Sequence, residues 1–311
     1  MLRAQLFGAG RVTYGDQTLT GFPNQQACLL LCYLWLNRAY PQSRERLAAL
    51  FWGDLPAATA RKSLRNALWR MRQGLQGLGA QPDDYLLIGD ESVALLTSGP
   101  FWLDVAVFET AQLACQDLPG SELTPEQAAH LKTAVDVYTG DLLEGVYADW
   151  CLHERERLGL LYLGALQKLV AYHGQRGEHE RALLYGERIL ARDPTREKIH
   201  RQMMQLHWLA GDRNAALAQF KRCAQILRDE LDTVPMGETT RLYQQMAANR
   251  YNPADSAPAV TPAANTARPE AIQSLARHAL DRLRRLQTAV EETQTELRQL
   301  EQMLGAALSE P

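Results

Sequence analysis

The sequence predicts a mainly α-helical protein with small β elements near its N-terminus, followed by a long helical repeat and a coiled-coil helix. Three observations support this fold class. The first hundred residues alternate between strand and helix signals, residues 111–249 carry helical periodicity alone, and residues 276–307 repeat apolar side chains every three or four positions. The 311 residues suffice for two independent hydrophobic cores.

The first domain begins with strand signals. Short β-like runs cover Arg3–Phe7 and Val12–Tyr14, and a Gly-Asp turn follows the second run. A helix over residues 25–37 comes next, with Asn24 in position to cap it.

Two more helices follow in this domain. Pro41 ends the preceding element, and Ser43 stands where an N-cap belongs for a helix over Arg44–Trp52. A third helix runs from about Thr59 to Leu75. Its apolar stripe has the spacing of a core-facing helix and comprises Leu64, Leu68, Met71 and Leu75.

A β-hairpin completes the first domain. Tyr85–Ile88 and Val93–Leu96 are apolar runs, and Gly89-Asp90-Glu91-Ser92 forms the turn between them. Three helices followed by a hairpin predict a winged helix-turn-helix domain over residues 1–110.

Residues 111–249 predict a TPR-like α-superhelix. Residues 177–183 match residues 211–217 at an offset of 34, with glycine, acidic, alanine and leucine positions in common. This helix-turn-helix period is typical of tetratricopeptide (TPR) repeats, which stack to bury their apolar faces. Ala182 and Ala216 take the small-residue packing position.

The C-terminal part predicts a linker and a coiled coil. Residues 250–269 hold four prolines and little apolar bulk, as a flexible linker does. Residues 270–308 carry a heptad seam that predicts a coiled-coil helix joining copies of the chain into an oligomer. The expected interface residues are Leu283, Leu286, Val290, Leu297, Leu300 and Leu304. The alternative is a helix that folds back on its own helical domain.

Composition excludes several classes of protein. The longest uncharged apolar run, residues 27–36, is too short to span a bilayer, and no signal peptide opens the chain, which predicts a cytoplasmic protein. Five irregularly spaced cysteines predict neither a disulfide framework nor a metal site, and we expect Cys28 and Cys32 to be buried thiols. The sequence has no Walker-type phosphate loop or catalytic constellation, so we expect neither an enzyme nor a cofactor.

The net charge of −3 conceals a basic patch. Residues 43–75 carry seven cations against Glu45 and Asp54, a balance of +5. This patch covers the second and third predicted helices of the first domain.

The third helix is the candidate DNA reader. Arginine and lysine donate to guanine, and asparagine pairs with adenine, in the major groove. The candidates for base readout are Lys62, Arg65, Asn66 and Trp69, and those for phosphate contact are Ser43, Arg44, Arg61, Arg70 and Arg72. The alternative is a solvated basic helix face, with Trp69 at the edge of the core.

Two further features have plainer interpretations. His173 and His207 lie one repeat apart, so we expect core or groove-lining roles for them. Residues 154–157, Glu-Arg-Glu-Arg, predict a solvated, ion-paired helix face.

The first domain resembles the winged-helix domain of OmpR/PhoB-type response regulators, in the version found in SARP-type activators. The matching segments are Leu6–Gly8, Ser43–Leu47, Leu50–Asp54, Ala60–Arg65, Leu103–Val105 and Phe108-Glu109. Residues 123–246 resemble the bacterial transcriptional activator domain (BTAD) of that family. The matches there are Tyr138–Leu143, Trp150, Glu156-Arg157, Asp193-Pro194, Glu197, His200-Arg201, Met203-Met204, Ala216-Leu217, Glu230-Leu231, Pro235 and Thr239.

The resemblance implies a sequence-specific transcriptional activator whose partners are double-stranded promoter DNA and RNA polymerase. The resemblance also implies that one loop faces RNA polymerase, and this loop comprises Asp54, Leu55, Pro56, Ala57 and Ala58. Asp232 replaces a glycine of the family pattern, so we expect a local difference at that helix end. The competing hypothesis is a TPR-type adaptor that binds a peptide or small ligand and uses the winged helix only as an interaction module.

Overall fold

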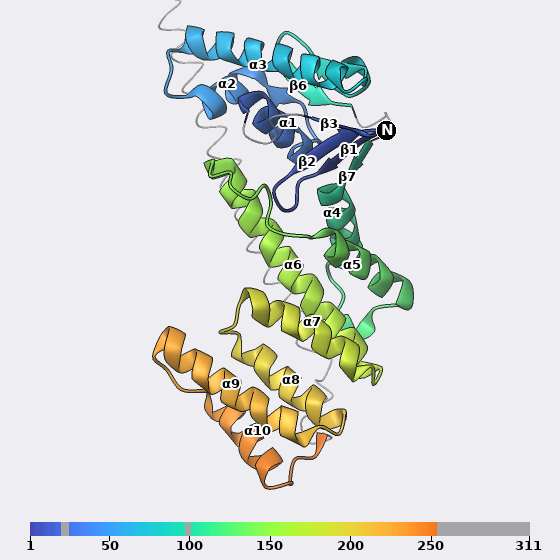
Figure 1. Ribbon diagram of the computed structural model, residues 1–311, viewed down its shortest axis with the longest axis vertical. Coiled ribbons are helices and arrows are strands. Elements are labelled where there is room, and N and C mark those ends of the chain that lie inside the picture. The colour runs from blue at the N-terminus through green and yellow to red at the C-terminus, as the bar shows by residue number, and fades with distance from the viewer. Residues whose placement is uncertain (20–24, 97–100, 254–311) are drawn as a thin grey trace, which may run out of the picture. The chain divides into compact units, whose positions relative to one another are not determined.

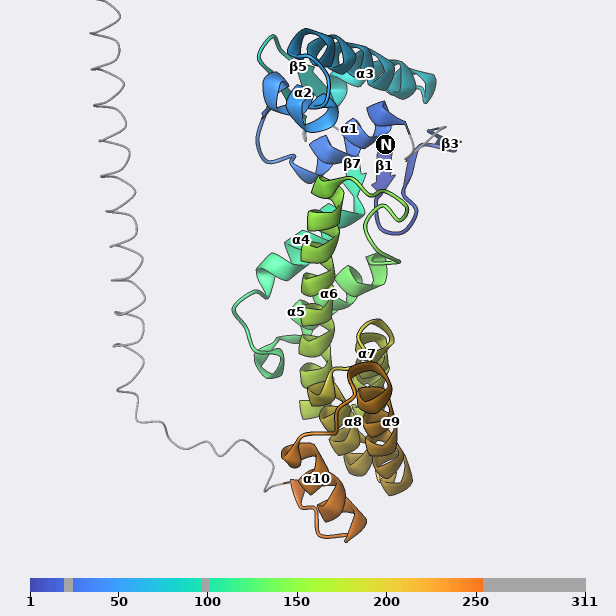
Figure 2. The same ribbon diagram turned by 90° about the vertical axis from the view of Figure 1, so that its left-hand side faces the viewer.

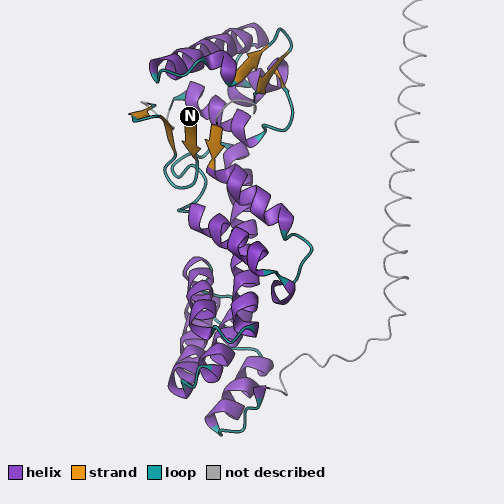
Figure 3. Ribbon diagram, turned by 90° about the vertical axis from the view of Figure 1, so that its right-hand side faces the viewer, coloured by secondary structure: helices purple, strands orange, loops and turns teal. Residues whose placement is uncertain are grey.

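The computed structural model describes residues 1–19, 25–96 and 101–253, and residues Met1–Tyr251 form one compact unit (Figure 1). Helices dominate this unit, and two small sheets lie in its N-terminal part (Figure 3). The predicted mainly α fold, a winged helix followed by an α-superhelix, is confirmed. The predicted coiled-coil helix, its six interface residues and most of the linker lie outside the described residues.

The first sheet has the strand order β3-β2-β1-β7. Strands β1 (Leu2–Gln5), β2 (Arg11–Tyr14) and β3 (Gln17–Thr18) form an antiparallel meander, and β7 (Phe101–Leu103) pairs in parallel with β1. The sequence did not reveal β7, because three residues are too few to show the alternation of a strand.

A buried carboxylate explains why the first strand ends before Phe7. The backbone N–H groups of Leu6 and Phe7 donate to the Asp104 carboxylate at 2.8 and 2.9 Å. Burial raises the pKa of Asp104, and these backbone donors oppose that rise. The carboxylate therefore satisfies the two N–H groups that follow β1, while the Leu6 carbonyl accepts from the Leu143 N–H and Phe7 forms an isolated antiparallel bridge with Leu142.

The three helices of the winged helix are α1 (Gln26–Leu36), α2 (Arg44–Trp52) and α3 (Ala57–Gly77). Helix α2 has its predicted bounds, and Ser43 caps it by accepting from the Arg46 N–H. The N-cap of α1 is Gln25 and not the predicted Asn24, which lies outside the described residues.

The second sheet forms the wing. Strands β5 (Leu86–Ile88) and β6 (Ser92–Leu95) make the predicted hairpin, and β4 (Gln42–Ser43) pairs with β6. Because Ser43 lies opposite Ser92, the hairpin turn is adjacent to the start of α2.

Within residues 101–253, seven α-helices follow. They are α4 (Asp104–Ala114), α5 (Pro125–Val137), α6 (Asp149–Gln175), α7 (His179–Arg192), α8 (Glu197–Leu209), α9 (Arg213–Leu231) and α10 (Gly237–Ala247). Neighbours in sequence pack against each other, and α6 is the longest helix described (Figure 2). No helix of the described part has the length and apolar character needed to cross a membrane.

The segments that repeat in the sequence share their local structure. Gly177 and Gly211 both adopt positive φ, at 74° and 83°, just before α7 and α9. Five residues further along, Ala182 and Ala216 are both fully buried. The equivalent positions thus make the same turn and the same close packing.

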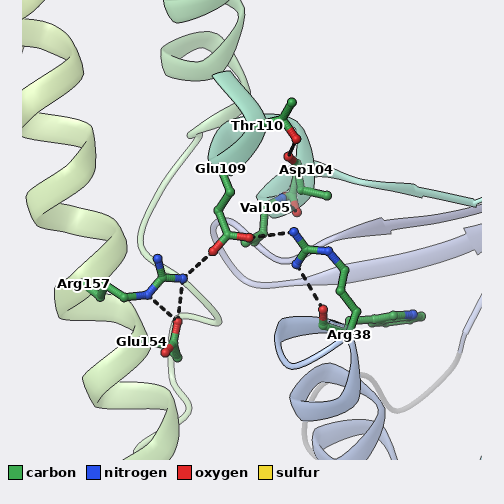
Figure 4. A network of polar contacts seen from close by, with 9 residues as sticks. Arg38, Asp104, Val105, Glu109, Thr110, Glu154 and Arg157 are labelled. Carbon is green, nitrogen blue, oxygen red and sulfur yellow. Dashed lines mark hydrogen bonds and ion pairs between the residues drawn. The ribbon is translucent and has the colours of Figure 1, made fainter. Parts of the chain in front are cut away.

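Aromatic side chains join the winged helix to α6. The rings of Tyr33 (α1) and Trp150 (α6) meet edge to face at 5.5 Å between centroids, and Phe51 (α2) contacts both. An ion-pair network connects the same parts: Glu109 of α4 accepts from Arg38, just after α1, and from Arg157 of α6 (Figure 4).

The prediction of a wholly solvated face over residues 154–157 is wrong for Arg155. Its guanidinium donates to the carbonyls of Leu142, Leu143 and Val146 at 2.7–2.8 Å. The loop that carries these carbonyls packs against the first sheet, where Leu143 N–H donates to the Leu6 carbonyl. Arg155 therefore holds the loop between α5 and α6, which contacts the first sheet.

Candidate nucleic-acid interface

Helix α3 has one buried and one exposed face. The predicted stripe of Leu64, Leu68, Met71 and Leu75 is buried in the core. On the exposed side lie the four residues expected to contact bases: Lys62, Arg65, Asn66 and Trp69. The alternative that Trp69 belongs to the core edge is wrong, because 62% of its surface is exposed.

The exposed side chains of α3 are not used within the described fold. Among the described residues, Lys62, Arg65 and Asn66 make no hydrogen bond or ion pair, and Trp69 stacks on no ring. Lys62, Asn66 and Trp69 follow one another at intervals of three or four residues, so they form a single stripe. Arg65 lies beside that stripe.

A groove of about 660 Å³ borders α3. Its walls come from the start of α2, the first half of α3 and the β5–β6 turn, and comprise Ser43, Arg44, Glu45, Arg61, Leu64, Arg65, Asp90 and Glu91. Three arginines and three carboxylates therefore share the groove.

The candidate phosphate-binding residues fall into two groups. Ser43, Arg44 and Arg61 line the groove, whereas Arg70 and Arg72 do not. Within the fold, Arg72 pairs with Asp83 at 2.8 Å, so part of its charge is already balanced.

Arg44 also has a role inside the fold. Its guanidinium donates to the Gly89 carbonyl at 3.0 Å, and its backbone N–H donates to the Glu91 carbonyl at 2.9 Å. Arg44 thus holds the hairpin turn against the start of α2.

Sequence reasoning missed the acidic side of this groove. Asp90 and Glu91 were assigned only to a turn, and their approach to Arg61 and Arg65 depends on the two-residue strand β4. A strand that short leaves no periodic signal in a sequence.

The predicted polymerase-facing loop is shorter than expected. Asp54, Leu55 and Pro56 form the loop, and Ala57 and Ala58 are the first residues of α3. All five are exposed. A hollow of about 240 Å³, bordered by Trp52 and Leu55 among others, lies beside the loop.

The cysteines and histidines of the described part do not form a metal site. All five cysteines are buried and unpaired, as expected for Cys28 and Cys32. Burial raises the pKa of Cys28 to about 11, so this thiol is protonated at neutral pH. No group of three or more potential metal ligands converges among the described residues.

Comparisons with known proteins agree with this architecture. The family model described as "Bacterial transcriptional activator domain" matches residues 103–247. The regulatory protein AfsR of Streptomyces coelicolor is 27% identical over 249 residues, which cover 79% of this chain and 24% of AfsR. AfsR of Streptomyces griseus is 25% identical with the same coverage. The chain thus spans about a quarter of the length of these curated relatives.

Among solved structures, Mycobacterium tuberculosis EmbR in complex with a low-affinity phosphopeptide is similar, with a TM-score of 0.64. The match covers 81% of this chain and 66% of the EmbR chain at 20% sequence identity. At that identity the likeness concerns the fold alone.

Proposed function

We propose that this chain, a SARP-type regulator with a bacterial transcriptional activator domain, binds promoter DNA sequence-specifically and activates transcription by recruiting RNA polymerase. The observation that carries the proposal is the unpaired polar face of α3, with Lys62, Arg65 and Asn66 exposed together. An α-helix of ordinary diameter fits the major groove of B-DNA.

The chemistry of this face suits base readout. Arginine and lysine can each donate to guanine O6 and N7, and asparagine can both donate to and accept from adenine. The exposed Trp69 offers a flat apolar surface to a thymine methyl group. Within the described part of the chain, the side chains of Lys62, Arg65 and Asn66 have no hydrogen bond or ion pair that DNA binding would have to break.

The groove beside α3 carries equal numbers of arginines and carboxylates, and this balance affects how strongly DNA binding would depend on phosphate contacts. Arg44, Arg61 and Arg65 attract phosphates, while Glu45, Asp90 and Glu91 repel them. We therefore expect few phosphate contacts, each making the slope of log K against log salt concentration more negative by about 0.9. Sequence-specific contacts from α3 would then supply a large share of the binding free energy.

The exposed loop before α3 supports the second half of the proposal. Leu55 is 42% exposed, and a hollow lies beside it on the α2 side. An exposed leucine beside a hollow is suited to an apolar contact with a protein partner. We assign this surface, with Asp54 and Pro56, to RNA polymerase.

The test begins with selection of genomic DNA fragments bound by the full chain, followed by titration of the best fragment in fluorescence anisotropy. Arg65→Ala and Asn66→Ala should each cost about 1–3 kcal/mol on that fragment and less on random DNA. Arg61→Ala should weaken binding to both DNAs alike. Lys221→Ala, on the exposed side of α9, is the matched control and should change neither.

Unchanged affinity of both Arg65→Ala and Asn66→Ala would show that α3 is not the reader. The competing adaptor hypothesis predicts no salt-dependent DNA binding at all, so the salt titration of the unmodified chain separates the two functions.

A further inference from the structure

A second hollow, of about 500 Å³, lies among helices of the superhelix. Its lining residues are Lys132 of α5, His173 of α6, and Arg181, Leu184, Tyr185 and Arg188 of α7. None of them belongs to the winged helix. The volume is in the range of pockets that hold small organic molecules.

The charge of this pocket is positive. Three lining residues are cations and none is a carboxylate. Outside the lining, Glu178 accepts from His173 at 2.6 Å and from Arg181 at 2.9 Å, and Asp136 lies 3.8 Å from Arg188. Counting lysine and arginine alone, three cations face these two acids, which leaves a surplus positive charge for an anion.

Several side chains of the pocket have N–H or O–H donors that make no hydrogen bond within the described residues and can bind a ligand. Among the described residues, the Lys132 ammonium and the Tyr185 hydroxyl make no hydrogen bond. Arg181 uses only Nη1, toward Glu178. Burial raises the pKa of Tyr185, so its hydroxyl stays protonated at neutral pH and can donate.

The remaining cation is held in place by the fold. Arg188 donates to the Val135 carbonyl at 2.8 Å and to the Tyr162 hydroxyl at 3.1 Å. Its charge is therefore fixed in the pocket wall before any ligand arrives, which lowers the entropic cost of binding.

The pocket also has an apolar side. The His173 and Tyr185 rings stack nearly parallel, at 14° and 5.5 Å between centroids, and Leu184 is 67% exposed. Stacked rings and an exposed leucine suit a flat apolar group.

We propose that this pocket binds a small organic anion in which a flat apolar body, such as an aromatic ring, carries a carboxylate or phosphate group. Lys132, Arg181 and Tyr185 bind the anionic group, and Leu184 contacts the apolar body. The proposal does not depend on DNA binding, because no residue of the pocket belongs to the winged helix.

The test uses phenyl phosphate and benzoate as probes, titrated into the full chain by isothermal titration calorimetry. Two control compounds each carry one feature of the probes: inorganic phosphate has the anionic group without a ring, and p-cresol has the ring without an anionic group. We expect phenyl phosphate or benzoate to bind saturably, with an affinity at least about tenfold higher than that of either control compound. A preference between the two probes distinguishes a phosphate ligand from a carboxylate ligand.

Variants localise the binding. Lys132→Gln and Tyr185→Phe should each weaken the preferred probe about 3- to 10-fold, as expected for one lost hydrogen bond. Leu184→Ala should weaken that probe and leave inorganic phosphate unchanged. Lys221→Gln removes an equally exposed cation elsewhere and should change nothing. Because Lys132 and Leu184 are exposed, these variants should keep the parent melting temperature.

Three results would overturn the proposal. The first is the absence of saturable binding by either probe at millimolar concentration. The second is an equal loss of binding in Lys132→Gln and Lys221→Gln. The third is an acidic peptide that binds through the same residues while neither probe does, which would make the pocket a peptide site.

Discussion

Replacing Arg155 by methionine should destabilise the chain far more than the same change at Arg157, two residues along the same helix. Arg155→Met keeps an unbranched apolar stem but removes the guanidinium that donates to the Leu142, Leu143 and Val146 carbonyls. The affected loop is buried, because Leu142 and Leu143 are fully inaccessible and Val146 nearly so.

The expected loss in the free energy of unfolding depends on which hydrogen-bond donors remain to each of the three carbonyls. Leu143 still accepts from the Val146 N–H at 3.0 Å, so it stays satisfied. The Val146 carbonyl loses its donor, at about 1–3 kcal/mol for a buried acceptor left without a partner, and the Leu142 carbonyl keeps only the weak Cys151 thiol donor, whose Sγ lies 3.9 Å away. We expect a loss of about 2–5 kcal/mol in the free energy of unfolding.

Arg157→Met is the matched control. Arg157 is 44% exposed and forms ion pairs with Glu109 and Glu154. Exposed ion pairs contribute about 0.2–1 kcal/mol each, so the control should lose at most about 2 kcal/mol. Arg155→Lys, which keeps the charge and about one hydrogen bond, should fall between the two.

The assay is urea denaturation of the full chain, followed by tryptophan fluorescence, with the midpoint and slope compared between variants. Equal losses in Arg155→Met and Arg157→Met would refute the assigned role of Arg155. The conclusion that this residue holds the loop between α5 and α6 would then fall as well.

Three other outcomes are expected. Ala182→Leu and Ala216→Leu should each cost about 1–3 kcal/mol by overpacking, seen as a lower melting temperature, and unchanged melting would contradict the repeat packing. Asp232→Gly should stabilise the chain by about 0.5 kcal/mol in urea denaturation, because Asp232 has φ of 49° and glycine adopts this conformation without a steric penalty; a destabilised variant would contradict this. Removal of residues 254–311 should halve the mass found by light scattering if the heptad seam joins two copies, and a full-length chain that is monomeric at micromolar concentration would exclude that role.

The helices of the winged helix could be predicted closely because their signals are local. Ser43 caps α2 through the neighbouring Arg46 N–H, and the stripe of α3 repeats over many residues. Strands β4 and β7 lacked such a signal, since each has only two or three residues and exists through its partner strands.

The environment of single side chains was harder to predict. Arg155 looks like one of several solvated charges until the preceding loop folds over it, and nothing near it in sequence predicts that contact. The face of α3 could be predicted because helical spacing decides which side chains point outward. Its acidic neighbours Asp90 and Glu91 could not, because they arrive from a distant hairpin.

The family resemblance predicts a local difference at Asp232, which replaces a glycine, and that expectation stays a prediction. The residue ends α9 in the left-handed conformation, with φ of 49° and ψ of 41°. This is the conformation that glycine adopts most easily at a helix end, so aspartate keeps the backbone path at some cost in stability.

Helix α6 determines how the segments packed against its two ends are rotated relative to each other. One end packs Trp150 against Tyr33 of the winged helix, and the other supplies His173 to the pocket beside α7. An uninterrupted helix of 27 residues is about 40 Å long, and each residue added within it turns everything beyond by about 100°. A single inserted residue would thus leave every local contact of the winged helix intact and yet turn α7 relative to α5, so that Arg181 and Arg188 would no longer share one pocket with Lys132.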